Sequence, residues 1–168
     1  KKGQKKIVKK NGKNYDKIAD HIGLIPLVII SPADRNLIIE GSSTRRKFID
    51  GVIGQIDKVY LKNLMDYNKI LAQRNALLKY FAKNRTFDAE TLEIYNHQMN
   101  ELAHPIYEKR KAFMEVFISI FSKRHFSISN GVEKIGIQYI SDLNKKNMSE
   151  LLDQSLEKDK ILQFTSVG

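Results

Sequence analysis

Hydrophobic side chains recur at alternating spacings of four and three residues along two long stretches of the chain. Such a repeat places apolar side chains on one face of a helix, which can then pack against a second helix. A single basic residue interrupts each stripe, Arg74 in the first and Lys109 in the second. With residues 82–87 as the connection and Asp88 as a helix cap, the stripes predict an antiparallel helical hairpin. The stripes are Tyr60, Leu64, Tyr67, Leu71, Arg74, Leu78 and Phe81, followed by Leu92, Tyr95, Met99, Leu102, Ile106, Lys109, Phe113, Val116 and Ile120.

Shorter elements are expected on both sides of this helical hairpin. Asn11-Gly12 adopts the positive φ angles of a two-residue turn at little cost, so its neighbours predict a β-hairpin. The apolar, β-branched run at 24–30 predicts a strand buried on both faces, and Pro105 should kink the second long helix. The expected fold class is α+β and predominantly helical. Further expected elements are a short helix at 16–22 closed by Gly23, a turn at 32–39, a helix from Thr44 or Arg45, a strand at 134–141, a helix at 147–157 and a strand starting at 161–167.

Positive charge is concentrated at the amino terminus. The net charge of the 168 residues is +10, and residues 1–17 hold eight lysines against Asp16 alone. The rest of the chain is nearly balanced, with 21 basic and 18 acidic side chains. A lysine cluster of this kind releases counterions from a phosphate backbone, and it also protects an exposed strand edge from aggregation. Both interpretations stay open for the candidate DNA-binding residues Lys5, Lys6, Lys9, Lys10 and Lys13.

Several classes of protein are disfavoured by what the chain does not contain. There is no cysteine, and the apolar run at 24–30 is too short to span a bilayer, so we expect a cytoplasmic protein without a membrane partner. The amino terminus has no Met and no apolar signal segment, which suggests a piece of a longer protein. Gly12-Lys13 lacks the other glycine of a phosphate-binding loop, so ATP hydrolysis by this stretch alone is not expected.

No catalytic or metal-binding residues are predicted. His97, Glu101 and His104 share one helix face at spacings of four and three. They offer only three donors and no fourth ligand is indicated, so a solvated helix face is the favoured interpretation. No Ser-His-Asp or Cys-His arrangement is evident in the sequence.

Three consecutive cations follow a short polar corner near the start of a predicted helix. Ser42, Ser43 and Thr44 are natural caps, and Arg45, Arg46 and Lys47 come directly after them. Cations in the first turn oppose the helix dipole unless an anion compensates, and a phosphate beside the free amides would do so. The alternative is a structural role, in which an arginine binds Asp50 or backbone carbonyls nearby. The sequence leaves both readings open.

This segment, read from Pro32 to Asp50, resembles the signature region of the RecF family of bacterial DNA replication and repair proteins. That region reads Pro, an acid, three variable residues, two aliphatics, a glycine-containing turn, and then Arg-Arg-x-aromatic-aliphatic-Asp. Here the last part is Arg45-Arg46-Lys47-Phe48-Ile49-Asp50, and departures occur at Ala33, Glu40 and Ser42. The segments 28–32, 55–57 and 67–79 are also similar to the family at matching distances.

The resemblance implies an ABC-type, SMC-like ATPase that dimerises around ATP and Mg²⁺, binds DNA as a duplex or at a gap junction, and loads recombinase with RecO and RecR. The resemblance also implies a part in the SOS response, and the intact parent would be a slow DNA-dependent ATPase. This stretch, without the Walker A, signature and Walker B motifs, would not be an enzyme. Residues 1–38 would form the edge of the ATPase lobe with the basic hairpin, 39–160 a helical lid, and 161–168 the start of a strand returning to the lobe.

The segment at 32–41 resembles, by its position between lobe and lid, the loop that couples nucleotide binding to movement in ABC ATPases. The alternative function is a non-catalytic helical-hairpin module whose seam binds a protein partner. Candidate residues for phosphate or DNA binding, or for coupling the lobe to the lid, are Asp34, Ser42, Ser43, Arg45, Arg46, Lys47 and Asp50.

Overall fold

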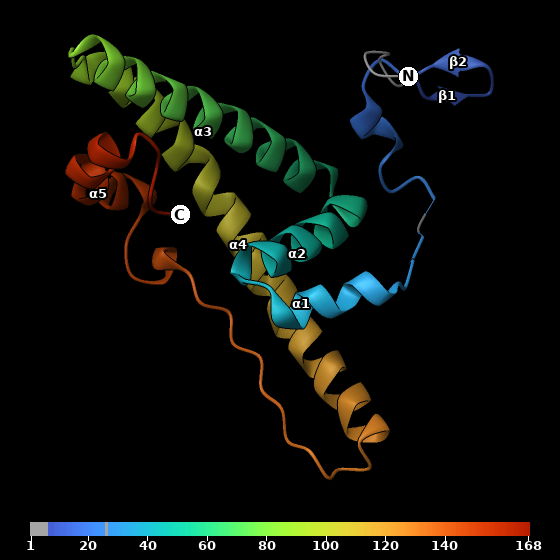
Figure 1. The fold of residues 1–168 in the computed structure, drawn as a ribbon. Helices are drawn as coiled ribbons and strands as arrows, with labels where there is room; N and C mark the ends of the chain where they lie inside the picture. Colours follow the sequence, from blue (N-terminus) through green and yellow to red (C-terminus); the bar gives the residue numbers. More distant parts are fainter. Residues whose placement is uncertain (1–6, 26) are drawn as a thin grey trace. The chain divides into compact units, whose positions relative to one another are not determined.

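The computed structural model describes residues 7–25 and 27–168 (Figure 1). Helices make up most of these residues, and a small antiparallel sheet is present near the amino terminus. The predicted α+β, mainly helical class is confirmed. The chain forms two compact units, one reaching to Leu61 and the other running from Lys62 to Gly168.

The sheet of the first unit is the predicted basic hairpin. Strand β1 (Lys9–Lys10) pairs antiparallel with β2 (Lys13–Asn14). Asn11 and Gly12 form the turn with φ angles of 51° and 79°. A turn with two positive φ angles matches the right-handed twist of the strands. Asn11 and Gly12 therefore set the register of the hairpin, as predicted. Lys5 and Lys6 lie outside the described residues.

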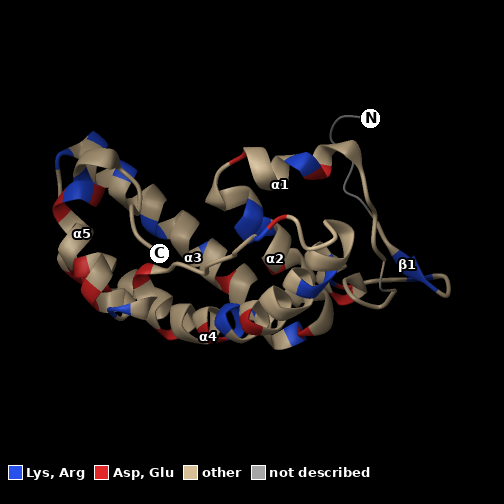
Figure 2. Cartoon of the chain, turned by 90° about the horizontal axis from the view of Figure 1, so that it is seen from below, with Lys and Arg blue, Asp and Glu red and all other residues tan. Residues whose placement is uncertain are grey.

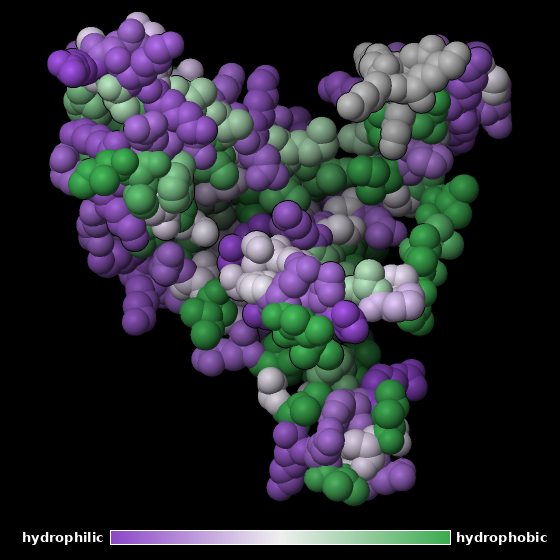
Figure 3. Space-filling model, viewed as in Figure 1, coloured by the Kyte–Doolittle hydropathy of each residue, from purple (hydrophilic) through white to green (hydrophobic). Residues whose placement is uncertain are grey.

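The chain then turns through a short 3₁₀ helix, η1 (Ile18–His21), and Gly23. Gly23 has a φ of 77°, and a Cβ placed there would collide with the backbone of Gln55, so both conformation and space require glycine. The predicted strand at 24–30 is wrong for the described residues of that range, which form no strand. Val28 and Ile30 are 86% and 88% exposed, and the apolar colour of this stretch is visible in Figure 3. A buried strand needs a neighbouring strand to pair its backbone amides and carbonyls, and none of the described segments pairs with this one.

Two short elements and one longer helix complete the first unit before α3. They are η2 (Pro32–Arg35), α1 (Asn36–Ile39) and α2 (Ser42–Ile56). Helix α2 begins earlier than predicted: its N-cap residue is Gly41, which has no side chain to accept a hydrogen bond from the first helical amides. Ser42 and Ser43 are therefore the first two residues of the helix, and the expectation that they cap it is wrong.

The second unit is built on the predicted helical hairpin, formed by α3 (Lys58–Asn84) and α4 (Ala89–Ile128). Asp88 caps α4, accepting a hydrogen bond from the Thr91 amide at 3.1 Å. Helix α4 continues through Pro105. Buried Leu78, Phe81 and Leu92 form one core cluster between the two helices. The antiparallel pairing follows from the short connection and the facing stripes (Figure 1).

The buried face of α4 follows the predicted stripe only as far as Ile106. Beyond it Lys109 is exposed, and Val116 and Ile120 are 62% and 55% exposed, while Met114 is buried. A straight α-helix drifts by about 20° per heptad from a strict seven-residue repeat, so a stripe extended over four heptads leaves the packed face. The prediction for the distal half of α4 is therefore wrong by about one residue in register.

The chain leaves α4 through a turn and returns to a last helix. After η3 (Asp142–Asn144) comes helix α5 (Met148–Leu162), which confirms the helix predicted at 147–157 and begins at a capping box formed by Asn147 and Glu150. Met148 and Leu152 pack with Met99 and Ala103 of α4 in a second core cluster. The predicted strands at 134–141 and 161–167 are wrong. The first range forms no strand, and α5 extends to Leu162 before an irregular tail. Alternating side chains favour a strand, but a strand also needs a partner to accept its backbone hydrogen bonds.

Candidate functional site

The basic hairpin presents its lysines to solvent. Lys9, Lys10 and Lys13 are exposed, and the ribbon of β1 is blue in Figure 2, the colour of Lys and Arg. Lys10 lies directly opposite Lys13 in the register. Like charges facing each other across a strand pair repel, and an anion bound between them would relieve that repulsion. The hairpin therefore offers a small, preformed cationic edge.

Arg45 is anchored by backbone carbonyls. Its Nη1 donates to the carbonyl oxygen of Leu37 at 3.0 Å and to that of Glu40 at 2.9 Å. Both acceptors belong to the end of α1 and the residue that follows it, where carbonyls lack partners within the helix. The contact ties α1 to α2 and matches the structural alternative that the sequence left open.

Arg46 and Lys47 remain exposed on the second turn of α2. Arg46 Nη1 lies 3.3 Å from the Ser42 hydroxyl, one turn earlier on the same helix. Because α2 begins at Ser42, the three cations occupy the fourth to sixth helical positions and not the first turn. The dipole effect fades within the first turn, so the electrostatic argument for an anion at this place is weaker than the sequence suggested.

Two acidic candidates have structural partners. The Tyr60 hydroxyl donates to Asp50 Oδ1 at 2.5 Å, joining α2 to the start of α3, and Tyr60 is 1% exposed. The Tyr60 amide also donates to Asp57 Oδ1 at 2.9 Å. Asp34 Oδ2 accepts a hydrogen bond from the Ser31 amide at 2.8 Å at the start of η2. The structure thus places Asp50 in a helix junction and Asp34 in a turn.

The histidines of α4 form no cluster with metal-binding geometry in the described part of the chain. His97 Nε2 lies 3.9 Å from Glu101 Oε1, and both side chains are largely exposed. Among the helices that the structure describes, none is long and apolar enough to cross a membrane.

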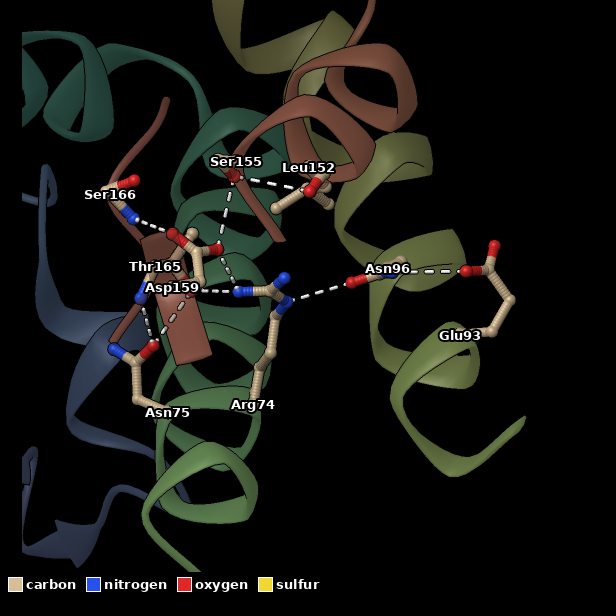
Figure 4. Close-up of polar contacts among 9 residues, drawn as sticks. All are labelled: Arg74, Asn75, Glu93, Asn96, Leu152, Ser155, Asp159, Thr165 and Ser166. Atoms are coloured by element: carbon tan, nitrogen blue, oxygen red, sulfur yellow. Dashed lines mark hydrogen bonds and ion pairs between the residues drawn. The ribbon is translucent and has the colours of Figure 1, made fainter. Parts of the chain in front are cut away.

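Sequence reasoning missed a buried polar cluster in the second unit (Figure 4). Arg74 of α3 and Asp159 of α5 are both 0% exposed, and Nη1 lies 2.8 Å from Oδ2. Arg74 Nε also donates to Asn96 Oδ1 on α4 at 2.8 Å. The signal was visible, because Arg74 interrupts an apolar seam and a buried arginine needs an acid. Its partner could not be named, because Asp159 is 85 residues away.

The same cluster holds the segment after α5. Arg74 Nη1 donates to Thr165 Oγ1 at 2.7 Å, and the Ser166 amide donates to Asp159 Oδ1 at 2.9 Å. The Thr165 amide and hydroxyl both donate to Asn75 Oδ1 at 2.8 Å. Gln163, with a φ of 59°, ends α5 in the left-handed conformation that turns the chain back.

Two groups of the second unit have shifted pKa values. Burial raises the pKa of the Tyr67 phenol, and the positive charges of Arg110 and Arg74 oppose part of that rise. The Thr91 hydroxyl and amide, by donating to Asp88, lower the pKa of that exposed carboxyl. Both shifts come from local structure and mark no acid and base pair.

Comparisons with known proteins identify the fold. No protein-family model matches the chain. A solved structure described as the recombination mediator protein RecF-ATP in the RecFOR pathway matches 96% of this chain and 45% of its own, with a TM-score of 0.83 and 32% identity. A second, described as RecF-ATPrS in the same pathway, matches with a TM-score of 0.86. The chain therefore has the fold of part of an ABC-type ATPase.

The similar curated proteins share one description. The DNA replication and repair protein RecF of Flavobacterium johnsoniae is 57% identical over 168 residues, all of this chain and 47% of the relative. RecF of Parabacteroides distasonis is 44% identical over 165 residues, 98% of this chain and 44% of the relative. The chain is homologous over its whole length to part of RecF, which confirms the resemblance seen in residues 32–50. It spans about half the length of the curated relatives it matches.

Proposed function

We propose that this chain is the part of a RecF-like protein that comprises the edge of the ATPase lobe and the helical lid inserted in it. The intact protein would bind DNA and ATP and, with RecO and RecR, help load recombinase at gaps during replication, recombinational repair and the SOS response in the bacterial cytoplasm. The observation that carries the proposal is the 57% identity to a curated RecF across the whole chain. A solved relative described as part of the RecFOR pathway supports the choice of partners.

ATP and Mg²⁺ would be used by the intact parent, which we propose to be a slow DNA-dependent ATPase that dimerises around ATP. The support for ATP is the similar solved structure described as RecF-ATP. This stretch contributes no phosphate-binding loop, so its role is positional. Residues 1–38 would belong to the lobe edge, 39–160 to the lid and 161–168 to the return toward the lobe.

DNA contact is assigned to the basic hairpin, with Lys5, Lys6, Lys9, Lys10 and Lys13 as the residues involved. The facing pair Lys10 and Lys13 supports this choice, because bound phosphate would remove their mutual repulsion. Contacts of this kind are sequence-blind and depend on salt. Ser42, Ser43, Arg46 and Lys47 remain candidates for a second phosphate contact on α2.

The test is a salt titration of the affinity of this chain for duplex and gapped DNA. One variant carries glutamine at the three described hairpin lysines, and a matched control carries glutamine at three exposed lysines of α3 and α4. We expect the slope of log affinity against log salt to fall by about 1 for each hairpin lysine that contacts a phosphate. No binding at low salt would favour the helical-hairpin interaction module instead, and an unchanged slope would exclude the hairpin lysines from the DNA contact. The hairpin lysines are Lys9, Lys10 and Lys13, and the control lysines are Lys69, Lys79 and Lys111.

Coupling between lobe and lid is assigned to Arg45, Asp50 and Asp34. Arg45 holds the end of α1 against α2, and Asp50 holds Tyr60 at the start of α3. Movement of the 32–41 segment would pass through these contacts to the lid. In the intact protein, Arg45→Ala should weaken ATP-driven dimerisation several-fold, whereas the control Lys79→Ala should not. If Arg45→Ala and Arg46→Ala both leave dimerisation and DNA binding unchanged, the two arginines serve only the local fold.

A further inference from the structure

The buried cluster around Arg74 has a feature that helix packing alone does not require. Its ion pair joins α3 to α5, yet two of its members also bind the segment that follows α5. Thr165 Oγ1 accepts a hydrogen bond from Arg74 Nη1, and the Ser166 amide donates one to Asp159 Oδ1. The cluster therefore ends in the backbone and side chains of an irregular segment, at 163–168 (Figure 4).

The hydrogen bonds of Thr165 and Ser166 lead back to the cluster or to its neighbour Asn75 on α3. The Thr165 amide and hydroxyl bind Asn75 Oδ1, and the Ser166 amide binds Asp159 Oδ1. An irregular segment has no regular backbone ladder of its own, so its orphaned amides must find side-chain acceptors. Here half-buried Asn75 on α3 and buried Asp159 on α5 supply them.

We propose that Arg74, Asn75, Asp159, Thr165 and Ser166 form a latch that fixes the path of residues 163–168 against α3. A buried ion pair is a poor source of net stability, since an apolar pair of similar volume often serves as well. Charged groups at such places can instead select one arrangement among several, because any other arrangement leaves a charge unpaired. Here the arrangement selected is the docking of the segment after α5.

Both charged side chains of the latch hydrogen-bond to the segment at 163–168 as well as to each other. Asp159 Oδ2 accepts from Arg74 and from the Ser155 hydroxyl, at 2.8 and 3.2 Å, while Oδ1 is turned to the Ser166 amide. The arginine in turn uses Nη1 for both Asp159 and Thr165. Undocking the segment would therefore remove one acceptor from the guanidinium and one donor from the carboxylate at once.

An apolar contact is the competing explanation for the docking. Val167 packs against the core cluster that contains Met99. If Val167 held the segment, the polar contacts would merely follow the position that Val167 imposes. The two explanations differ in which substitution releases the segment.

The experiment is hydrogen exchange on this chain, following the Thr165 and Ser166 amides individually by NMR. The variant Arg74→Met/Asp159→Leu replaces the ion pair with apolar side chains of similar size. A second variant, Asn75→Ala, removes only the acceptor of Thr165. A third, Val167→Ala, reduces only the apolar contact. Because Phe164 is exposed beside the latch, cleavage by chymotrypsin after Phe164 gives an independent measure of undocking.

We expect Arg74→Met/Asp159→Leu to speed exchange at Thr165 and Ser166 at least tenfold and to accelerate cleavage after Phe164. Amides in the middle of α3 and α4 should keep their protection. Asn75→Ala should speed exchange at Thr165 more than at Ser166, and Val167→Ala should have less effect than the double replacement.

Two results would overturn the proposal. The first is full protection of both amides in Arg74→Met/Asp159→Leu, which would assign the docking to Val167. The second is loss of protection throughout α3 and α4 in Asn75→Ala, which leaves the ion pair intact, because the cluster would then support the helices in general and not the segment.

Discussion

Removing one member of the buried ion pair should destabilise the second unit far more than removing both. In Arg74→Met the Asp159 carboxylate stays in a place where it is 0% exposed and keeps only the Ser155 hydroxyl and the Ser166 amide as donors. Breaking a buried pair in this way costs about 3–5 kcal/mol of unfolding free energy. Replacing both partners, in Arg74→Met/Asp159→Leu, should return the free energy of unfolding to within about 2 kcal/mol of the parent.

The assay is urea unfolding followed by far-ultraviolet circular dichroism at neutral pH, with the full double-mutant cycle. A matched control is the exposed pair Lys62 and Asp66, whose side chains are 77% and 45% exposed and whose Nζ to Oδ2 distance is 2.9 Å. Its cycle should give a coupling of about 0.3–0.5 kcal/mol, because solvent screens it.

Equal m-values across the variants would show that the unfolding transitions expose similar surface, so that midpoints compare stability directly. If Arg74→Met lowered the free energy of unfolding by less than about 1 kcal/mol, the reasoning would be refuted, because an unpaired buried carboxylate should destabilise the fold by more than that. A double replacement as unstable as the single one would equally refute it, since the cost would then come from lost packing and not from the orphaned charge.

Three further predictions rest on single sites. The pKa of Asp88 should lie below that of an ordinary aspartate and should rise in Thr91→Val, as measured by the NMR shift of the carboxyl carbon. Because the pKa is lowered in the folded state, the stabilisation from Asp88 is present above the unfolded pKa and is lost as the pH falls through the folded pKa. The pKa of Tyr67 should lie above that of an ordinary tyrosine and should rise further in Arg74→Met, as measured by the NMR shift of the phenol carbon. Because the pKa is raised in the folded state, the stabilisation from Tyr67 is present below the unfolded pKa and is lost as the pH rises through the folded pKa. Gly12→Ala should cost the hairpin about 1 kcal/mol, because φ is 79° there, and loss of strand-like carbon shifts at the flanking lysines would report it; unchanged shifts would contradict the turn assignment.

Local patterns explain why much of the fold was predictable. The helical hairpin follows from apolar spacing, which depends only on the geometry of one helix. The hairpin turn follows from Asn11-Gly12, and the start of α5 from the Asn147 and Glu150 capping box, both of which act over a few residues. A spacing rule that holds over a few turns becomes inaccurate over a long helix. In α4 the predicted apolar stripe departs from the buried face beyond Ile106.

Apart from the short basic hairpin, the predicted strands were wrong. The ranges 24–30, 134–141 and 161–167 have the composition or alternation of strands, yet the described residues in them form none. A helix satisfies its backbone within its own segment, whereas a strand depends on partners that can be far away in the chain. Composition therefore measures the capacity to pair and not the presence of a partner.

The candidate site divides along the same line. From the sequence alone it was possible to locate the basic hairpin, the three consecutive cations of α2 and the resemblance to RecF, because each is carried by neighbouring residues. Only the tertiary structure decided that Arg45 binds the carbonyls of Leu37 and Glu40, and that Asp50 meets Tyr60. It alone paired Arg74 with Asp159, 85 residues away, because the cost of burying a charge is settled by whichever distant groups the fold brings to it.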